Sequence, residues 1–133
     1  MALAQTKAAT FIQEHTEEIS SHRVISLLLD GALERADQAK QAFLNSQQDE
    51  LLQLLGKLIA IVNGLKNSLN MQAGGEISEN LDALYEYMIH RISASEAENL
   101  VSVLDEVSTL LAEVKSGWDD MSWETMAAGE VSA

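Results

Sequence analysis

Residues 51–69 read LLQLLGKLIAIVNGLKNSL, a stretch in which apolar side chains recur at every third or fourth position. One apolar row comprises Leu51, Leu55, Leu58, Val62, Leu65 and Leu69. Such spacing marks one face of an α-helix, because a turn takes 3.6 residues. Leu54 and Ile61 form a second row beside the first, so the apolar stripe is wider than one helix–helix contact requires. The pattern predicts an amphipathic helix from about residue 49 to residue 71.

Three further segments share this periodicity, and in each the inward face is predicted from the apolar spacing. In segment 21–45 that face comprises Ile25, Leu28, Leu29, Ala32, Ala36, Ala39 and Phe43. In segment 76–92 it comprises Ile77, Leu81, Leu84, Met88 and Ile92. From residue 95 to about 118 it comprises Leu100, Leu104, Val107, Leu111, Val114 and Trp118, widened by Val103 and Leu110. Short connections between the segments predict an antiparallel, up-down four-helix bundle.

Local signals suggest where these helices begin and end. Ser46 with Asp49, and Ser95 with Glu98, have the spacing of capping boxes, in which two side chains satisfy free backbone amides. The pair Gly74-Gly75 predicts the turn between the second and third helices. Gly31 lies inside the first helix, where glycine is unfavourable, and we expect it to permit the close approach of a neighbouring helix.

Composition supports an all-α fold in a single domain of 133 residues. Hydrophobic residues make up 47% of the chain, and proline, which breaks helices, is absent. Eight basic and 21 acidic residues give a net charge of −13. This charge disfavours nucleic acid and anionic membranes as partners, and its simplest interpretation is that it keeps an apolar-rich protein in solution.

The chain is predicted to have three parts. Residues 1–19 form an N-terminal segment that we expect to be a short helix or a lid over a binding groove. Residues 20–120 form the four-helix bundle, and residues 121–133 form a flexible acidic tail. The N-terminus lacks the apolar run of a secretory signal, so we expect a cytoplasmic protein.

No residue pattern supports catalysis or metal binding. Bundle metal sites use Glu-x-x-His, but Ile12, Ile19 and Tyr87 stand three residues before the histidines. Cysteine is absent, and Gly74-Gly75 lacks the lysine of a phosphate-binding loop. We therefore predict no catalytic residues, no metal and no cofactor. The second apolar rows have two readings, since they either widen the core or line a groove for a partner helix.

Three motifs resemble the flagellar secretion chaperone family called FliS. The central one comprises Ser68-Leu69-Asn70-Met71, Gly74-Gly75-Glu76-Ile77 and residues 80–88, NLDALYEYM. His22-Arg23 followed by Leu28-Leu29-Asp30-Gly31-Ala32 is similar to the family's first helix, and Leu110-Leu111-Ala112-Glu113 with Trp118 to its last. The resemblance covers about residues 20–120. It departs from the family near the N-terminus, where the usual tyrosines are absent and Ser21 replaces a proline.

The resemblance implies a non-enzymatic helical bundle that binds the disordered C-terminal segment of flagellin in the cytoplasm. Such a chaperone prevents premature polymerisation and aids delivery to the flagellar type III export apparatus, whose components are further expected partners. The partner-binding residues predicted on this hypothesis are Ile25, Leu29, Leu54, Leu58, Ile61, Leu65, Leu84, Met88, Val103 and Leu110. The alternative from a different class is a helical structural or adaptor protein that binds another folded partner.

Overall fold

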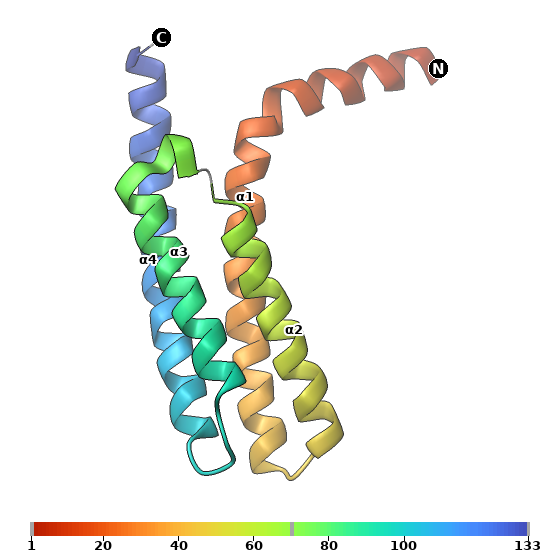
Figure 1. Cartoon of the computed structure of the whole chain (residues 1–133). Helices are drawn as coiled ribbons and strands as arrows, with labels where there is room; N and C mark the ends of the chain where they lie inside the picture. Colours follow the sequence, from red (N-terminus) through yellow and green to blue (C-terminus); the bar gives the residue numbers. More distant parts are fainter. Residues whose placement is uncertain (1, 70, 133) are drawn as a thin grey trace.

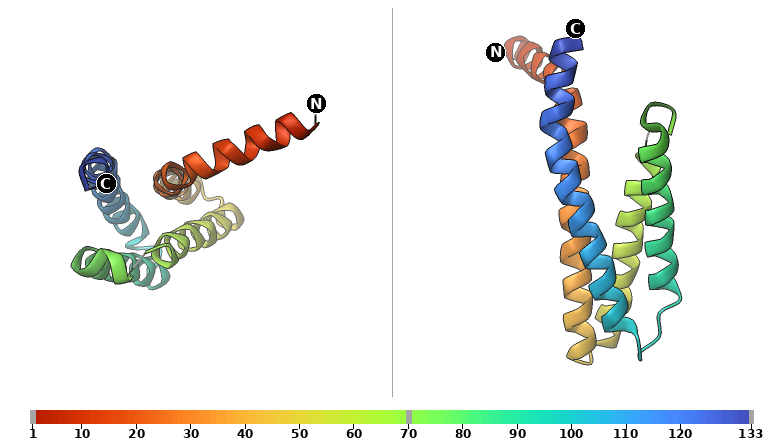
Figure 2. Two further views of the ribbon diagram at one scale, coloured as in Figure 1. Left: turned by 90° about the horizontal axis from the view of Figure 1, so that it is seen from above. Right: turned by 90° about the vertical axis from the view of Figure 1, so that its left-hand side faces the viewer.

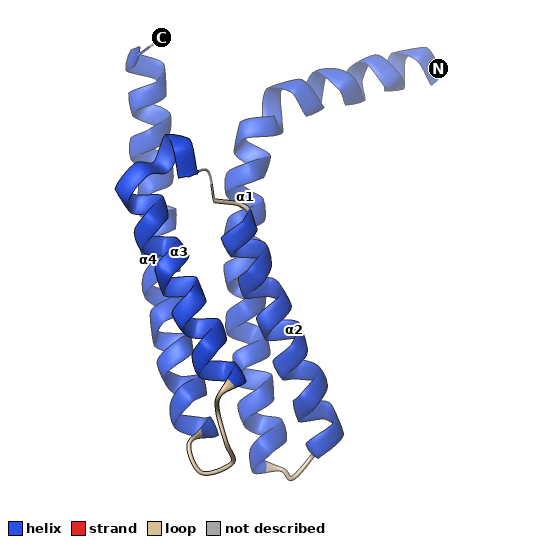
Figure 3. Ribbon diagram, viewed as in Figure 1, coloured by secondary structure: helices blue, strands red, loops and turns tan. Residues whose placement is uncertain are grey.

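The computed structural model describes the backbone of residues 2–69 and 71–132, and the side chains of residues 22–69 and 75–120. The described chain forms four α-helices and no strand (Figure 3). They are α1 (Ala2–Leu44), α2 (Gln48–Asn67), α3 (Met71–Ser93) and α4 (Leu100–Ser132). None of the described helices is long and apolar enough to cross a membrane.

The helices run alternately up and down and form a four-cornered bundle (Figures 1 and 2). α1 packs against α2 and α4, and α3 closes the ring by contacting the same two helices. The most extensive contact is between α1 and α2, and the smallest is between α3 and α4. The predicted antiparallel four-helix bundle is confirmed, and its loosest edge is the one between α3 and α4.

The core is organised around alanines of α1. Ala32, Ala36, Ala39 and Ala42 are almost completely buried. Because an alanine side chain is a single methyl group, it allows α2 and α4 to approach the α1 backbone closely. These neighbours supply the large buried side chains, which are Leu58, Val62 and Leu65 from α2 and Val103, Leu104, Val107 and Leu111 from α4. Small residues on one helix and large ones on its neighbours thus fill the same space.

α3 contributes a smaller part of the core than its periodicity predicts. Met88 and Ile92 are buried as expected, whereas Leu81 and Leu84 are only partly buried. Ile77 was predicted to point inward but is 55% exposed, so that prediction is wrong. Tyr85, which the apolar pattern did not single out, is 2% exposed, and burial raises the pKa of its phenol to about 12.

The ends of the helices differ from those predicted. α2 begins after Gln47 with no side-chain cap, and Ser46 has a positive φ of 58° in the preceding turn, so the Ser46/Asp49 capping box is not formed. Ser95 does not cap α4, which begins at Leu100. Its hydroxyl instead donates to the carbonyl oxygen of Ile92 at 2.6 Å, at the end of α3. Both short sequence patterns match the capping-box motif, but neither forms a capping box in the structure.

The connection between α2 and the main part of α3 contains two breaks, one of them at Gly75. α2 ends at Asn67 and α3 already begins at Met71. Gly75 then interrupts the helical geometry with φ 52° and ψ −126°, a conformation that side chains with a Cβ rarely adopt. The glycine therefore separates a short helical piece that begins at Met71 from the main part of α3, so the break predicted at Gly74-Gly75 is confirmed.

α1 and α4 extend beyond the four-helix core at the end where both termini lie (Figure 1). Segment 1–19, from residue 2 onward, continues α1, and segment 121–132 continues α4. The predicted lid and the predicted flexible tail concern side chains outside the described residues, so both remain predictions.

Substitution by alanine should change the free energy of unfolding in opposite directions at Gly31 and at Gly75. A Cβ added at Gly31 would lie 3.7 Å from Ile61 Cδ1, an ordinary contact, so Gly31→Ala should stabilise the protein by about 0.5–1 kcal/mol. Gly75→Ala forces a side chain into positive φ and should destabilise it by about 1 kcal/mol or more. Urea unfolding measures both, and a destabilised Gly31→Ala would contradict the packing described here.

Truncating Leu104 should cost far more stability than truncating Leu55. Leu104 is 1% exposed, and Leu104→Ala should cost about 2–5 kcal/mol because it leaves a cavity. Leu55 is only partly buried at the edge of the core, so Leu55→Ala should cost clearly less. Equal losses in chemical unfolding would show that the two leucines are equally buried.

Candidate functional site

The ten predicted partner-binding residues divide into two groups by exposure. Six of them belong to the buried core: Leu29, Leu54, Leu58, Leu65, Met88 and Val103. Ile25, Ile61, Leu84 and Leu110 are partly buried at its edge. Only this second group is accessible to a partner without opening the bundle. On α2 the structure buries Leu54 and leaves Leu55 partly exposed, the reverse of what was predicted for these two residues.

Two of the accessible residues, Leu84 and Leu110, face each other across the loose edge between α3 and α4. The register of this edge is set where Tyr87 and Arg91 of α3 meet Glu106 of α4. Because the helices are antiparallel, Leu84 lies about one turn beyond Tyr87, and Leu110 about one turn beyond Glu106 in the same direction.

The next turns of the same edge are also apolar and partly exposed. We call this surface the α3/α4 face, comprising Ile77, Leu81 and Leu84 of α3 with Leu110 and Val114 of α4. The apolar character continues to Gly117, where an added Cβ would meet nothing within 4 Å. An exposed apolar surface on a bundle is suited to binding an apolar partner segment.

A polar cluster closes the other end of the α3/α4 face. The Tyr87 hydroxyl donates to Glu106 Oε1 at 2.9 Å, and Arg91 Nε donates to the same oxygen at 3.0 Å. These two donors hold the pKa of Glu106 below its ordinary value, and the same carboxylate raises the pKa of Tyr87 and of Arg91. The cluster ties α3 to α4 where the apolar face ends.

On its opposite side, α3 is tied to α2 through Lys66. The Lys66 ammonium lies 2.7 Å from Glu86 Oε1 and 3.7 Å from Asp82 Oδ1, and the hydrogen bond to Glu86 is the main reason why its pKa is raised. These ion pairs are at the surface, where solvent screens them and each contributes little to stability. α3 is therefore the helix most weakly attached to the bundle.

A clasp of two aromatic rings joins α1 to α4 beside the α3/α4 face. The rings of His22 and Trp118 are stacked, with centroids 4.7 Å apart and planes inclined by 10°. Trp118 Nε1 donates to the carbonyl oxygen of His22, and His22 Nε2 donates to the carbonyl oxygen of Trp118, both at 3.0 Å. Further along the edge, Lys115 pairs with Asp30 at 3.0 Å and Lys40 with Asp105 at 2.9 Å. α4 is thus fastened to α1 over its length, and the free side of the bundle is that of α3.

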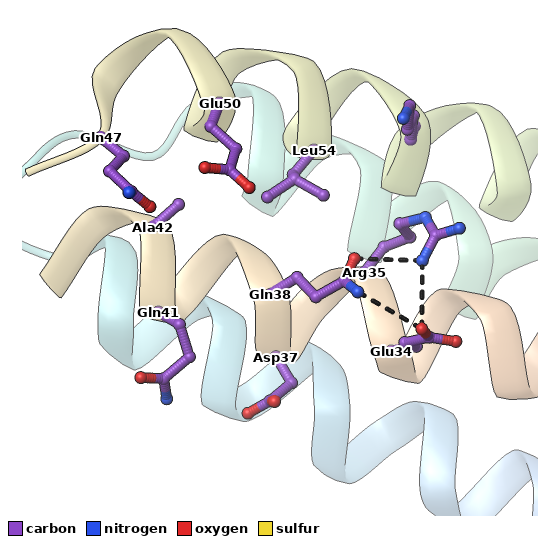
Figure 4. A pocket seen from close by; sticks show the side chains of 10 residues that line it. Glu34, Arg35, Asp37, Gln38, Gln41, Ala42, Gln47, Glu50 and Leu54 are labelled. Atoms are coloured by element: carbon purple, nitrogen blue, oxygen red, sulfur yellow. Dashed lines mark hydrogen bonds and ion pairs between the residues drawn. The ribbon is translucent and has the colours of Figure 1, made fainter. Parts of the chain in front are cut away.

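An open pocket of about 480 Å³ lies between α1 and α2, near the turn that joins them (Figure 4). Its lining is mainly polar, and Leu54 and Ala42 form its apolar part. Two hydrogen bonds and one ion pair of 3.0–3.6 Å join the side chains of Glu34, Arg35 and Gln38. Within the described part of the chain, no group of three acidic or histidine side chains could hold a metal ion.

Comparison with known proteins gives a consistent family assignment. The family model described as flagellar protein FliS matches residues 4–125. The flagellar secretion chaperone FliSB of Pseudomonas aeruginosa is 48% identical over 111 residues, covering 84% of this chain and 88% of that protein. Flagellar secretion chaperones FliS of Vibrio cholerae and Salmonella typhimurium are 34% and 33% identical, each over 84% or more of both chains.

The fold defines an all-α four-helix bundle with an apolar, partly exposed edge between α3 and α4. Since the family model and the relatives match most of the chain, this protein belongs to the FliS family of flagellar secretion chaperones. The resemblance found in the sequence motifs is confirmed.

The apolar spacing predicts the core better than it predicts these contacts. It places Ile77 in the core, whereas Ile77 is 55% exposed, and it does not single out Tyr87, which donates to Glu106. Trp118 packs against the core as predicted, but the spacing does not predict that its ring stacks on His22, 96 positions earlier in the chain. No local spacing indicates a pair so distant, and only the antiparallel register of α1 and α4 brings it together.

Removing the Tyr87 hydroxyl should lower stability at neutral pH and leave it little changed in acid. Glu106 has a pKa below its ordinary 4.5 in the folded state, so its contribution is present above pH 4.5 and is lost as the pH falls through the lowered value. Tyr87→Phe deletes one donor to this carboxylate. Thermal unfolding measured from pH 7 to pH 2 should therefore show that the difference in stability between Tyr87→Phe and wild type becomes smaller as the pH falls.

The matched control is Glu113→Gln, on the same helix. Among the described residues, Glu113 forms no ion pair or side-chain hydrogen bond. Glu113→Gln should therefore leave the change of stability at acidic pH the same as in wild type. A Tyr87→Phe effect of the same size at all pH values would show that the hydroxyl does not act through Glu106.

Proposed function

We propose that this protein is a cytoplasmic flagellar secretion chaperone that binds the disordered C-terminal segment of flagellin. In this role it prevents premature polymerisation and aids delivery of flagellin to the flagellar type III export apparatus. Membership of the FliS family supports the class of function. The observation that carries the finer proposal is the exposed apolar α3/α4 face at the loosest edge of the bundle.

The α3/α4 face is suited to an amphipathic segment that folds on binding. Ile77, Leu81 and Leu84 offer apolar side chains at successive turns of α3, matching the one-turn spacing of apolar residues on a partner helix. Buried apolar area contributes about 25 cal/mol per Å², and part of this gain offsets the cost of ordering the segment. The partner must therefore cover a large surface, which a disordered chain can do by wrapping.

The deeply buried predicted residues have a different role in this proposal. Met88 lies one turn from Leu84 along α3, and Val103 lies on α4 beyond Glu106; both are 0% exposed. They form the floor that keeps the two helices in position and contact flagellin only if α3 moves outward. The weak attachment of α3 favours such movement, because its ion pairs to α2 and α4 are at the surface.

The experiment is calorimetric titration of the flagellin C-terminal segment into the intact chaperone. One-to-one binding should give a negative heat-capacity change, because apolar surface is buried, and circular dichroism should show a gain of helix. Ile77→Asp should weaken binding by about tenfold or more, since it places a charge in a contact that becomes desolvated. Ile77 is 55% exposed in the free chain, so the variant should remain folded.

The matched control is Leu52→Asp. Leu52 is 59% exposed on α2, which lies outside the α3/α4 face, so its substitution should leave affinity unchanged. Equal loss in both variants would place flagellin elsewhere, and a heat-capacity change near zero without gain of helix would contradict coupled folding. Absence of binding to flagellin, with retention of another folded partner, would favour an adaptor function.

A further inference from the structure

A second exposed apolar surface lies between α1 and α2, at the edge of the bundle opposite the α3/α4 face. On α1, Val24 is 52% exposed and Leu27 is 55% exposed. On α2, Ile61 is partly buried and lies opposite Gly31, about one turn along the groove from Leu27. These residues, with Gly64, form the apolar half of what we call the α1/α2 groove. The function proposed above makes no use of it.

The groove is open at Gly64 of α2, because glycine has no side chain to fill it. The contact between Gly31 and Ile61 fixes the register of the antiparallel pair, so Leu27 lies near Gly64, one turn further along. A Cβ at Gly64 would meet nothing within 4 Å. Leu27 is 55% exposed and the space at Gly64 is open, so another helix can approach both α1 and α2 there.

The other half of the groove is the polar pocket near the α1–α2 turn (Figure 4). Glu34, Arg35 and Gln38 satisfy one another, whereas Glu50 and Lys57 form no ion pair among the described residues. Lys57 is about one turn from Ile61, and Glu50 is about two turns further towards the α1–α2 turn. Along its length, the groove therefore offers an apolar stretch, then an ammonium group, then a carboxylate.

This order of chemistry defines the occupant. From Val24 to Ala42 the groove measures about 27 Å, the length of an α-helix of about 18 residues. We propose that the α1/α2 groove binds an amphipathic helix of a partner protein, apolar at one end, with an acidic side chain opposite Lys57 and a basic one opposite Glu50. The net charge of −13 favours a helix whose outer face is basic.

Because the α1/α2 groove and the α3/α4 face are opposite edges, both can be occupied at once. A chaperone with a cargo on one edge and a docking helix on the other can be held by its partner without releasing the cargo. The inference does not depend on the identity of the cargo, since it rests on residues of α1 and α2 alone.

The test uses a fluorescent synthetic peptide of about 18 residues and the intact protein. The peptide has leucine at every third or fourth position through its first half, then one glutamate and one lysine spaced to meet Lys57 and Glu50. A second peptide has these two charges exchanged. Fluorescence anisotropy should show that the first peptide binds about tenfold more tightly than the exchanged one, because each charge then faces its opposite.

Gly64→Gln is the decisive variant. The added side chain has open space in the free protein and suits a helix better than glycine does, so folding is preserved. It lies about 60° around α2 from Ile61 and fills the groove, so peptide affinity should fall by about tenfold or more. Gly56→Gln is the matched control, since Gly56 is equally open but about 140° from Ile61, and affinity should change less than about twofold.

Three results would overturn the proposal. Equal affinities of Gly64→Gln and Gly56→Gln would show that charge alone holds the peptide. A loss caused by Ile77→Asp would place it on the α3/α4 face. Sedimentation that shows a concentration-dependent dimer, abolished by Gly64→Gln, would assign the groove to a second copy of this chain. Selective loss in Gly64→Gln, with a monomeric free protein, supports a docking helix.

Discussion

The close packing of α2 and α4 on the alanines of α1 is the constraint on which the rest of the bundle depends. Ala32, Ala36, Ala39 and Ala42 leave the α1 backbone accessible to large side chains from both neighbours. A bulkier residue at any of these positions would separate the helices and cost about 1–3 kcal/mol in overpacking. α1 thus serves as the common support of two helices, and neither of these supports α3 to the same degree.

The unequal packing explains where the exposed apolar surfaces occur. α3 has no comparable contact with α1, and its ties to α2 and α4 are ion pairs and a tyrosine hydroxyl at the surface. Its apolar side chains therefore remain partly uncovered along the α4 edge. At the opposite edge, Gly64 of α2 has no side chain to cover α1, and Leu27 of α1 is 55% exposed. The exposed apolar surfaces of this bundle occur where its helices do not cover one another.

The sequence predicts the helices better than it predicts their ends or their exposed edges. Leu58, Leu65, Leu104 and Leu111 repeat with helical spacing, and spacing suffices to place them in a core. The side chains of Leu54 and Leu55 point only about 100° apart around α2, so which of them is buried depends on how closely α1 and α3 approach α2. The local spacing of apolar residues does not determine these distances. Similarly, the exposure of Ile77 depends on the divergence of α3 from α4. The accessible part of the candidate site was thus only partly predictable.

The clasp between His22 and Trp118 has a consequence for how the chain folds during synthesis. The two residues are 96 positions apart, and closing so long a segment costs about 4 kcal/mol of chain entropy before any contact forms. As the chain leaves the ribosome, α1 and α2 pair first, and the alanine surface of α1 that awaits α4 stays uncovered until the last helix emerges. Trp118 stacks on His22 when α4 packs against α1 and completes the bundle. Because the ring environment of a tryptophan sets its fluorescence, Trp118, one of the two tryptophans in the chain, carries an optical signal for its stacking on His22.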